Sequence, residues 1–134
     1  MVVVVHPTVI REETVVSIRS YRDLDVWQRS MELALESHAL VRRFPIDERF
    51  ALTAQMRRAA ISVPSNVAEG NASGYRALYV SHVGRAQGSL AELETQMILA
   101  ERFDYLSSPV RFWELSDEVS RMLVALRRSL NRRP

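Results

Sequence analysis

The sequence predicts an all-α protein: an antiparallel up-down four-helix bundle over residues 21–134, preceded by an N-terminal extended arm over residues 1–20. Three observations support this fold class. From residue 21 onward, apolar residues recur every three or four positions, which is the period of an amphipathic helix. Glycine and proline contribute only 4 and 5 of the 134 residues and aromatic residues only 7%, whereas β-sandwiches and barrels need more of both. The helical stretches are separated by short connections, as in up-down bundles.

The first 20 residues differ in composition from the rest of the chain. Valine occupies positions 2–5, 15 and 16, and no helical period is present. Because valine favours extended backbone, we expect an arm, with a short strand as one form that it can take. The start of the chain lacks the basic segment and apolar core of a signal peptide, and no run of about 18 apolar residues occurs. We therefore expect a cytoplasmic protein with no membrane partner.

The first helix is expected to begin at Tyr21 and to stop at Phe44, because the proline at position 45 moves the preceding residue out of the helical conformation. Asp23 or Asp25 is expected to cap its start. The apolar stripe also contains a histidine, which we expect to be partly buried. The residues of this stripe are Leu24, Trp27, Met31, Ala34, Leu35, His38 and Val41.

The second helix is expected to open at residues 47–48 and to end within residues 70–74, whose two glycines tolerate the left-handed conformation of a helix terminus. Pro64 lies inside its apolar stripe and removes the N–H that would bond the carbonyl of Ala60. Because the apolar spacing continues past this point, we expect a kinked helix and not a loop. The nearby side chain of Asn66 is expected to bond the backbone groups that the proline frees.

Two further helices complete the predicted bundle. The third is expected over residues 75–103, with an apolar stripe that runs from Tyr75 to Ala100. The fourth is expected to follow Ser108 and Pro109, because serine is a favoured N-cap and proline a favoured first helical residue.

The second and third helices carry polar faces opposite their apolar stripes. These faces consist mostly of small residues with few charges, and Gly88 lies within one of them. A glycine inside a helix costs about 1 kcal/mol relative to alanine, which is tolerable where another backbone comes close. Two interpretations stay open, a neutral solvent-exposed face and a contact surface between subunits. The second predicts an oligomer interface made of Gln55, Arg58, Ser62, Asn66, Arg85, Gly88, Ser89 and Glu92.

Basic residues are concentrated at the end of the chain. The net charge is only +2 and all 18 basic residues are arginine, yet no acidic residue follows Glu118. Arginines there can simply complement the negative end of a helix dipole. Alternatively, they bind nucleic acid, because the planar guanidinium suits phosphate. The candidate nucleic-acid-binding residues are Arg121, Arg127, Arg128, Arg132 and Arg133.

Few kinds of catalysis fit the composition. The absence of cysteine excludes disulfides, cysteine-ligated zinc and thiol catalysis. No glutamate has a histidine three residues later, as di-iron bundles need, and no glycine-rich phosphate loop is present. We therefore expect no catalytic residue, no metal and no cofactor. One enzymatic alternative stays open: Arg76 and His82 match the loose spacing of HEPN-type ribonucleases, in which the arginine holds phosphate and the histidine acts in RNA cleavage.

Three segments carry a family resemblance. They are residues 23–28 (DLDVWQ), residues 44–70, which end in PSNVAEG, and residues 86–96 (AQGSLAELETQ). Over about residues 21–106 the chain resembles the four-helix-bundle family of 23S ribosomal RNA intervening-sequence proteins. The chain departs from the usual family pattern at Ala51, His82 and Arg85.

The resemblance implies a bacterial protein that assembles as a ring-shaped homopentamer and whose physiological role is unknown. A related branch, the accessory variability-determinant proteins of diversity-generating retroelements, works with a reverse transcriptase and binds nucleic acid. The resemblance implies no catalytic residue. From the residues and the resemblance together, we expect a non-enzymatic homo-oligomer whose further partner is RNA, DNA or a nucleic-acid enzyme.

Overall fold

The computed structural model describes residues 20–132, which form four α-helices and two short 3-10 helices with no strand. This confirms the predicted all-α class with four helices. The predicted arm lies outside the described residues, except for its last residue, Ser20. The helices are α1 (Asp25–Val41), α2 (Leu52–Ala72), α3 (Arg76–Arg102) and α4 (Val110–Asn131), and the 3-10 helices η1 (Tyr21–Asp23) and η2 (Ile46–Glu48) precede α1 and α2.

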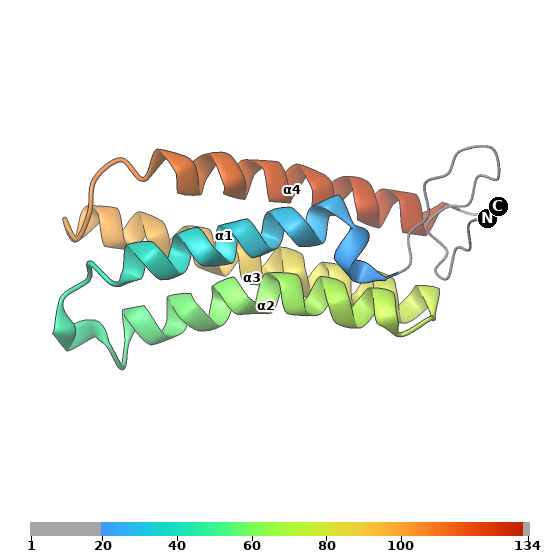
Figure 1. Ribbon diagram of the computed structural model, residues 1–134, viewed down its shortest axis with the longest axis horizontal. Coiled ribbons are helices and arrows are strands. Elements are labelled where there is room, and N and C mark those ends of the chain that lie inside the picture. Colours follow the sequence, from blue (N-terminus) through green and yellow to red (C-terminus); the bar gives the residue numbers. More distant parts are fainter. Residues whose placement is uncertain (1–19, 133–134) are drawn as a thin grey trace.

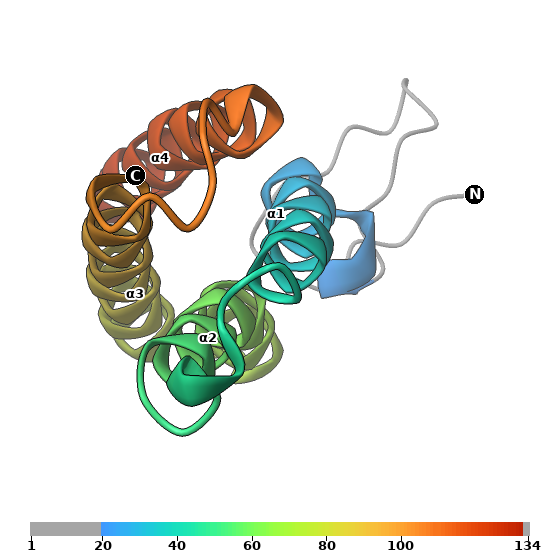
Figure 2. The same cartoon turned by 90° about the vertical axis from the view of Figure 1, so that its left-hand side faces the viewer.

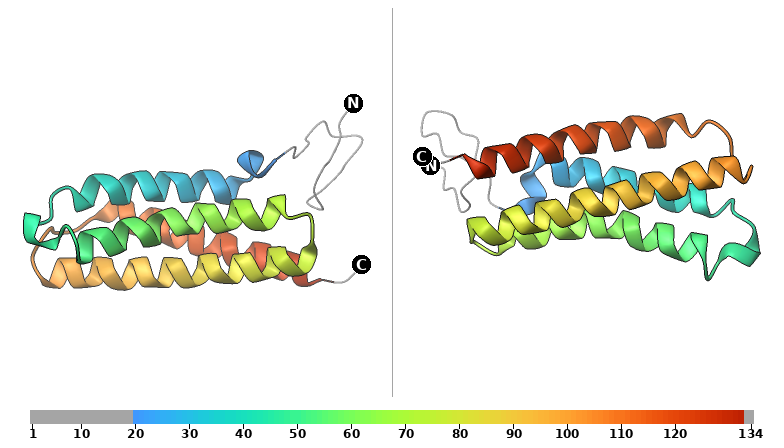
Figure 3. Two further views of the ribbon diagram at one scale, coloured as in Figure 1. Left: turned by 90° about the horizontal axis from the view of Figure 1, so that it is seen from below. Right: turned by 180° about the vertical axis from the view of Figure 1, so that it is seen from behind.

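The four helices lie along one long axis, and consecutive helices run in opposite directions (Figure 1). Each packs against two neighbours, in the order α1, α2, α3, α4 and back to α1, as the end-on view in Figure 2 shows. The most extensive contact is between α2 and α3, which lie side by side along the bundle (Figure 3). None of the helices within residues 20–132 is long and apolar enough to cross a membrane.

The core is apolar and receives side chains from all four helices. Tyr79 of α3 and Phe112 of α4 are its largest fully buried side chains. The apolar stripe predicted for the third helix is largely buried, although Tyr75 at its start is exposed.

The predicted stripe of α1 is wrong by about one residue in phase. Leu35 is 68% exposed and His38 is also exposed, so the expectation of a partly buried histidine is wrong. The cause is that two serines occupy core positions, which hides the true face from a hydrophobic pattern. One of them, Ser30, donates its hydroxyl to the carbonyl of Val26 and so satisfies its polar group within the helix. The buried residues of α1 are Val26, Ser30, Leu33, Ser37, Leu40 and Val41.

Helix α2 continues without interruption through Pro64, so the loop alternative is excluded, and the kink stays a prediction. The role predicted for Asn66 needs correction. Its Nδ2 donates to the carbonyl oxygen of Ser62 at 2.9 Å, and not to that of Ala60, which the proline leaves without its helical donor.

Both ends of α2 differ from the prediction. At its start, Glu48 lies in η2, and its Oε1 accepts a hydrogen bond from the backbone N of Leu52 at 3.3 Å. At its end, Gly70 remains helical and buried. A Cβ on this residue would lie 2.9 Å from Cβ of His82 and 3.0 Å from Cδ1 of Tyr79, so only glycine fits without a shift of these neighbours. Gly70 therefore permits the close approach of α2 and α3, and the chain reverses at Gly74, whose φ is +78°.

Candidate nucleic-acid interface

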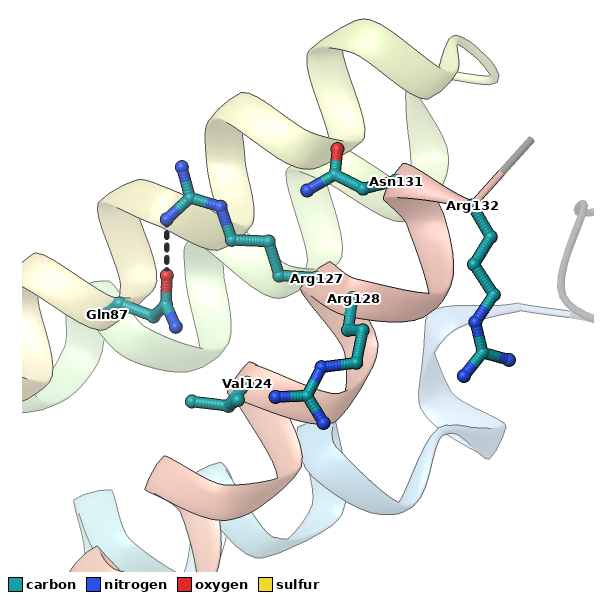
Figure 4. A pocket seen from close by; sticks show the side chains of 6 residues that line it. All are labelled: Gln87, Val124, Arg127, Arg128, Asn131 and Arg132. Carbon is teal, nitrogen blue, oxygen red and sulfur yellow. Dashed lines mark hydrogen bonds between the residues drawn. The ribbon is translucent and has the colours of Figure 1, made fainter.

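The arginines at the end of α4 line a surface hollow of about 360 Å³, to which α3 contributes one residue (Figure 4). We call it the basic hollow. Of the predicted nucleic-acid-binding residues, three meet here, Arg121 lies earlier on α4, and Arg133 lies outside the described residues. The residues that line the hollow are Gln87, Val124, Arg127, Arg128, Asn131 and Arg132.

Arg127 is held against α3. Its Nη1 donates to Oε1 of Gln87 at 2.7 Å (Figure 4). A Cβ placed on Gly84 would lie 3.5 Å from Nη1, 3.5 Å from Nη2 and 3.6 Å from Cζ of this guanidinium. Because the three distances are nearly equal, the flat face of the guanidinium is turned toward Gly84. The contact with α3 thus fixes the plane of Arg127.

Arg128 and Arg132 extend away from α3 (Figure 4). Both are exposed, and neither guanidinium forms a hydrogen bond or ion pair with another residue in the 20–132 range. Arg121 precedes Arg128 by seven residues, which is about two helical turns, so it lies on the same side of α4. Its charge is partly neutralised by an ion pair with Asp117. Arg128 and Arg132 are therefore the two cations of the hollow whose guanidiniums have no partner within residues 20–132 and can bind an anion.

Arg76 adds positive charge beneath the hollow. Its Nη1 donates to the carbonyl oxygens of Leu130, at 2.9 Å, and of Arg132, at 2.8 Å. The last carbonyls of a helix lack donors within the helix and form the negative end of its dipole, which repels anions. The guanidinium of Arg76 partly offsets that end, so the helix terminus opposes the charge of the α4 arginines less.

A second surface feature is a groove of about 340 Å³ between α2 and α3, which we call the polar groove. Side chains bond across it: the hydroxyls of Ser62 and Ser89 lie 2.7 Å apart, and Nε2 of Gln96 lies 3.4 Å from Oε1 of Gln55. Part of the predicted oligomer surface is thus used for contacts within one chain. The groove is lined by Gln55, Arg58, Ala59, Ser62, Ser89 and Glu92.

The remaining oligomer candidates lie beside this groove. Arg85 and Gly88 are exposed on α3, and Asn66 is half-buried on α2. No atom of another helix within residues 20–132 lies within 4 Å of a Cβ added to Gly88. The close backbone expected at this glycine is therefore not supplied within residues 20–132.

The structure does not bring Arg76 and His82 to a common partner. Arg76 bonds the end of α4, whereas Nδ1 of His82 lies 3.0 Å from Oδ1 of Asn66 on α2. The two side chains thus lie on opposite flanks of α3, each engaged in contacts between helices.

The sequence prediction missed Gln87, Val124 and Asn131 of the basic hollow. Asn131 follows Arg127 by four residues, so helical spacing alone places them on neighbouring turns. Gln87 is 40 residues from Arg127, and no local pattern signals that contact.

Comparison with protein families gives a match over most of the chain. Residues 22–125 match the family described as 23S rRNA-intervening sequence protein. No curated protein matches the chain. The matched range includes the polar groove and Arg121, and it stops before Arg127, Arg128 and Arg132.

Proposed function

This chain belongs to the 23S rRNA-intervening sequence protein family, and from this premise we propose that it is a non-enzymatic, homo-oligomeric module that binds RNA through the basic hollow. The observation that carries the proposal is the pair of exposed, unpaired guanidiniums of Arg128 and Arg132 beside the fixed Arg127. Cations without acidic partners are free to replace the counterions of phosphates, which is the main source of affinity for nucleic acid.

Self-assembly is the second part of the proposal, and the polar groove supports it. Arg58 of α2 and Glu92 of α3 line this groove with opposite charges, and neither forms an ion pair within the described range. A second copy can supply the complementary charges, which favours contact between subunits at this groove.

Sedimentation at micromolar concentration tests the assembly. The resemblance implies a ring of five, so we expect a species of about 77 kDa from subunits of 15.4 kDa. A single species at the mass of one subunit would refute this part of the proposal and leave RNA binding to be judged by itself.

Gel shifts with a labelled RNA at two salt concentrations test binding. We expect a shift that weakens steeply with salt, and a smaller salt slope for the double variant Arg128→Gln/Arg132→Gln, by about 0.7 for each lost contact to a single strand. Substitutions are used because a truncation of the chain before Arg128 would also remove Leu130, which belongs to the core. No shift by the unmodified protein at low salt would refute RNA binding.

The matched control is the double variant Arg49→Gln/Arg102→Gln. Both arginines are exposed and lie at the opposite end of the bundle, in the α1–α2 connection and the last turn of α3. The control removes the same net charge, so an equal loss of affinity would show that the effect depends on overall charge and not on the hollow.

The absence of catalysis is also part of the proposal. The separate engagements of Arg76 and His82 favour structural roles for both over the ribonuclease alternative. We expect the RNA recovered from the gel-shift reactions to be intact. Fragments that disappear in the His82→Ala variant would instead establish the ribonuclease.

A further inference from the structure

The basic hollow contains more than cations. Its lining includes two carboxamides, Gln87 and Asn131, and the apolar side chain of Val124. Contact with the outer phosphates of a duplex needs only positive charge. Carboxamides and a flat cation are instead the groups that bind the edge and the face of an unstacked base.

Arg127 offers a flat surface of fixed orientation. One face of its guanidinium is turned to Gly84, and the bond to Gln87 holds the plane in place. Arginine planes are established stacking partners of unpaired bases, and a plane that is already held loses little freedom on binding. The second face of the guanidinium is the natural platform for a base in the hollow.

The two carboxamides supply directional hydrogen bonds near that platform. Oε1 of Gln87 accepts a hydrogen bond from Arg127. The Nε2 of Gln87, which is a hydrogen-bond donor, is therefore available to other partners. The amide of Asn131 forms no side-chain hydrogen bond with other residues of the described range, so both its donor and its acceptor are available. Together they match the mixed donor and acceptor pattern of a base edge.

From these groups we infer that the basic hollow takes one unpaired nucleotide of single-stranded RNA, with its base on Arg127, its edge against Asn131 and Gln87, and its phosphates on Arg128 and Arg132. The inference rests on the proposed function and specifies its substrate class. The volume of about 360 Å³ suits one nucleotide, since it lies near the lower limit of about 300 Å³ for ligand pockets.

The sharpest test uses two RNA-like probes of equal charge. One is a fluorescein-labelled oligoadenylate of about ten nucleotides, and the other is the same ribose-phosphate chain without bases. Fluorescence anisotropy at constant salt should give about tenfold tighter binding of the oligoadenylate, which is the contribution of about one stacked base. Equal affinities for the two probes would overturn the inference.

Two substitutions that keep the charge form a matched pair. Arg127→Lys removes the flat surface, so we expect about tenfold weaker binding of oligoadenylate and no change for the chain without bases. Arg102→Lys makes the same exchange at an exposed position in the last turn of α3, at the opposite end of the bundle, so we expect a change within about twofold on both probes. Asn131→Ala should weaken oligoadenylate binding alone and leave the salt slope unchanged. The far-ultraviolet circular dichroism of each variant verifies its fold.

The outcomes separate this inference from the proposed function. Binding of both probes with equal affinity, or equal effects of the two lysine substitutions, would refute the nucleotide site and leave RNA binding through charge intact. Binding of neither probe by the unmodified protein would refute both. Tighter binding of oligoadenylate that depends on Arg127 and not on Arg102 would establish the site.

Discussion

Nη1 of Arg76 lies 2.9 Å from the carbonyl oxygen of Leu130, joining the first turn of α3 to the last turn of α4 across 54 positions of sequence. The same nitrogen donates to the carbonyl of Arg132. This guanidinium therefore holds the turn that carries the basic hollow. Without it, the carbonyls of Leu130 and Arg132 would depend on water.

We predict that Arg76→Met loosens the end of α4. Amide hydrogen exchange over residues 128–132 should accelerate, and the free energy of unfolding should fall by about 1 kcal/mol, the net worth of one to two exposed hydrogen bonds. Arg102→Met is the control, since it removes the same charge from the same helix, far from the last turn of α4. Exchange rates that are the same in both variants would contradict the role of Arg76.

We predict that Gly70→Ala destabilises the bundle by about 1–3 kcal/mol, because the added methyl group would lie 2.9 Å from Cβ of His82 and must push α2 and α3 apart. Urea unfolding measures the loss. Gly84→Ala is the matched control within a helix, since its Cβ would make only ordinary contacts of 3.5 Å. It should be neutral or slightly stabilising, as alanine favours the helix. An unchanged midpoint for Gly70→Ala would contradict the close contact.

We predict that Gly88→Leu separates the subunits without unfolding them. No atom of another helix within residues 20–132 lies within 4 Å of a Cβ at this position, so a single chain accommodates the larger side chain. Sedimentation should show a smaller species, while circular dichroism stays helical. Ala125→Leu, at an exposed position of α4, is the control and should leave the oligomer intact. A full-size oligomer of Gly88→Leu would place the interface elsewhere.

We predict an alkaline loss of stability that depends on Tyr79. Burial raises the pKa of Tyr79 above its usual value of about 10, and a hydrogen bond from Asn71 partly opposes this. The folded state thus prefers the neutral phenol, so its contribution to stability is complete below about pH 10 and is lost as the pH rises toward the folded pKa.

The measurement compares the unmodified protein with Tyr79→Phe in urea at pH 8 and at about pH 11. At pH 8 the variant should be less stable, because Nδ2 of Asn71 loses its partner. The difference should shrink at the higher pH. The Tyr105 hydroxyl donates to Glu48, which also raises the pKa of Tyr105, but both proteins share this contribution. A constant difference between the two proteins would contradict the prediction.

The accuracy of the sequence prediction follows the chemistry of each helix. The buried faces of α2, α3 and α4 are mainly apolar, and helical spacing identifies them. In α1, Ser30 and Ser37 occupy core positions. A hydrophobic pattern does not count serine as a core residue, so it follows the apolar residues at the edge of the buried face and gives a stripe that is wrong in phase. The sequence prediction placed Gly70 at the end of a helix. The reason for this glycine is its packing against α3, a tertiary contact that local sequence does not reveal.

The candidate site was predictable in part for the same reason. Arg127, Arg128 and Arg132 are close in sequence, and helical spacing brings them to one end of α4. The partners that define the hollow come from α3, since Gln87 fixes Arg127 and Arg76 fixes the last turn. Their contacts depend on how two helices align, and that alignment is set by packing of the whole bundle and not by local sequence.

The even number of antiparallel helices places the start of α1 and the end of α4 at the same end of the molecule (Figure 1). Any group joined directly to residue 20 or to residue 132 would therefore lie at the end of the bundle that carries the arginines of α4. A circular permutant that joins the present termini and opens within residues 103–109 would move both ends to the far side. Attached to a sensor surface through those new ends, it would display the basic end outward.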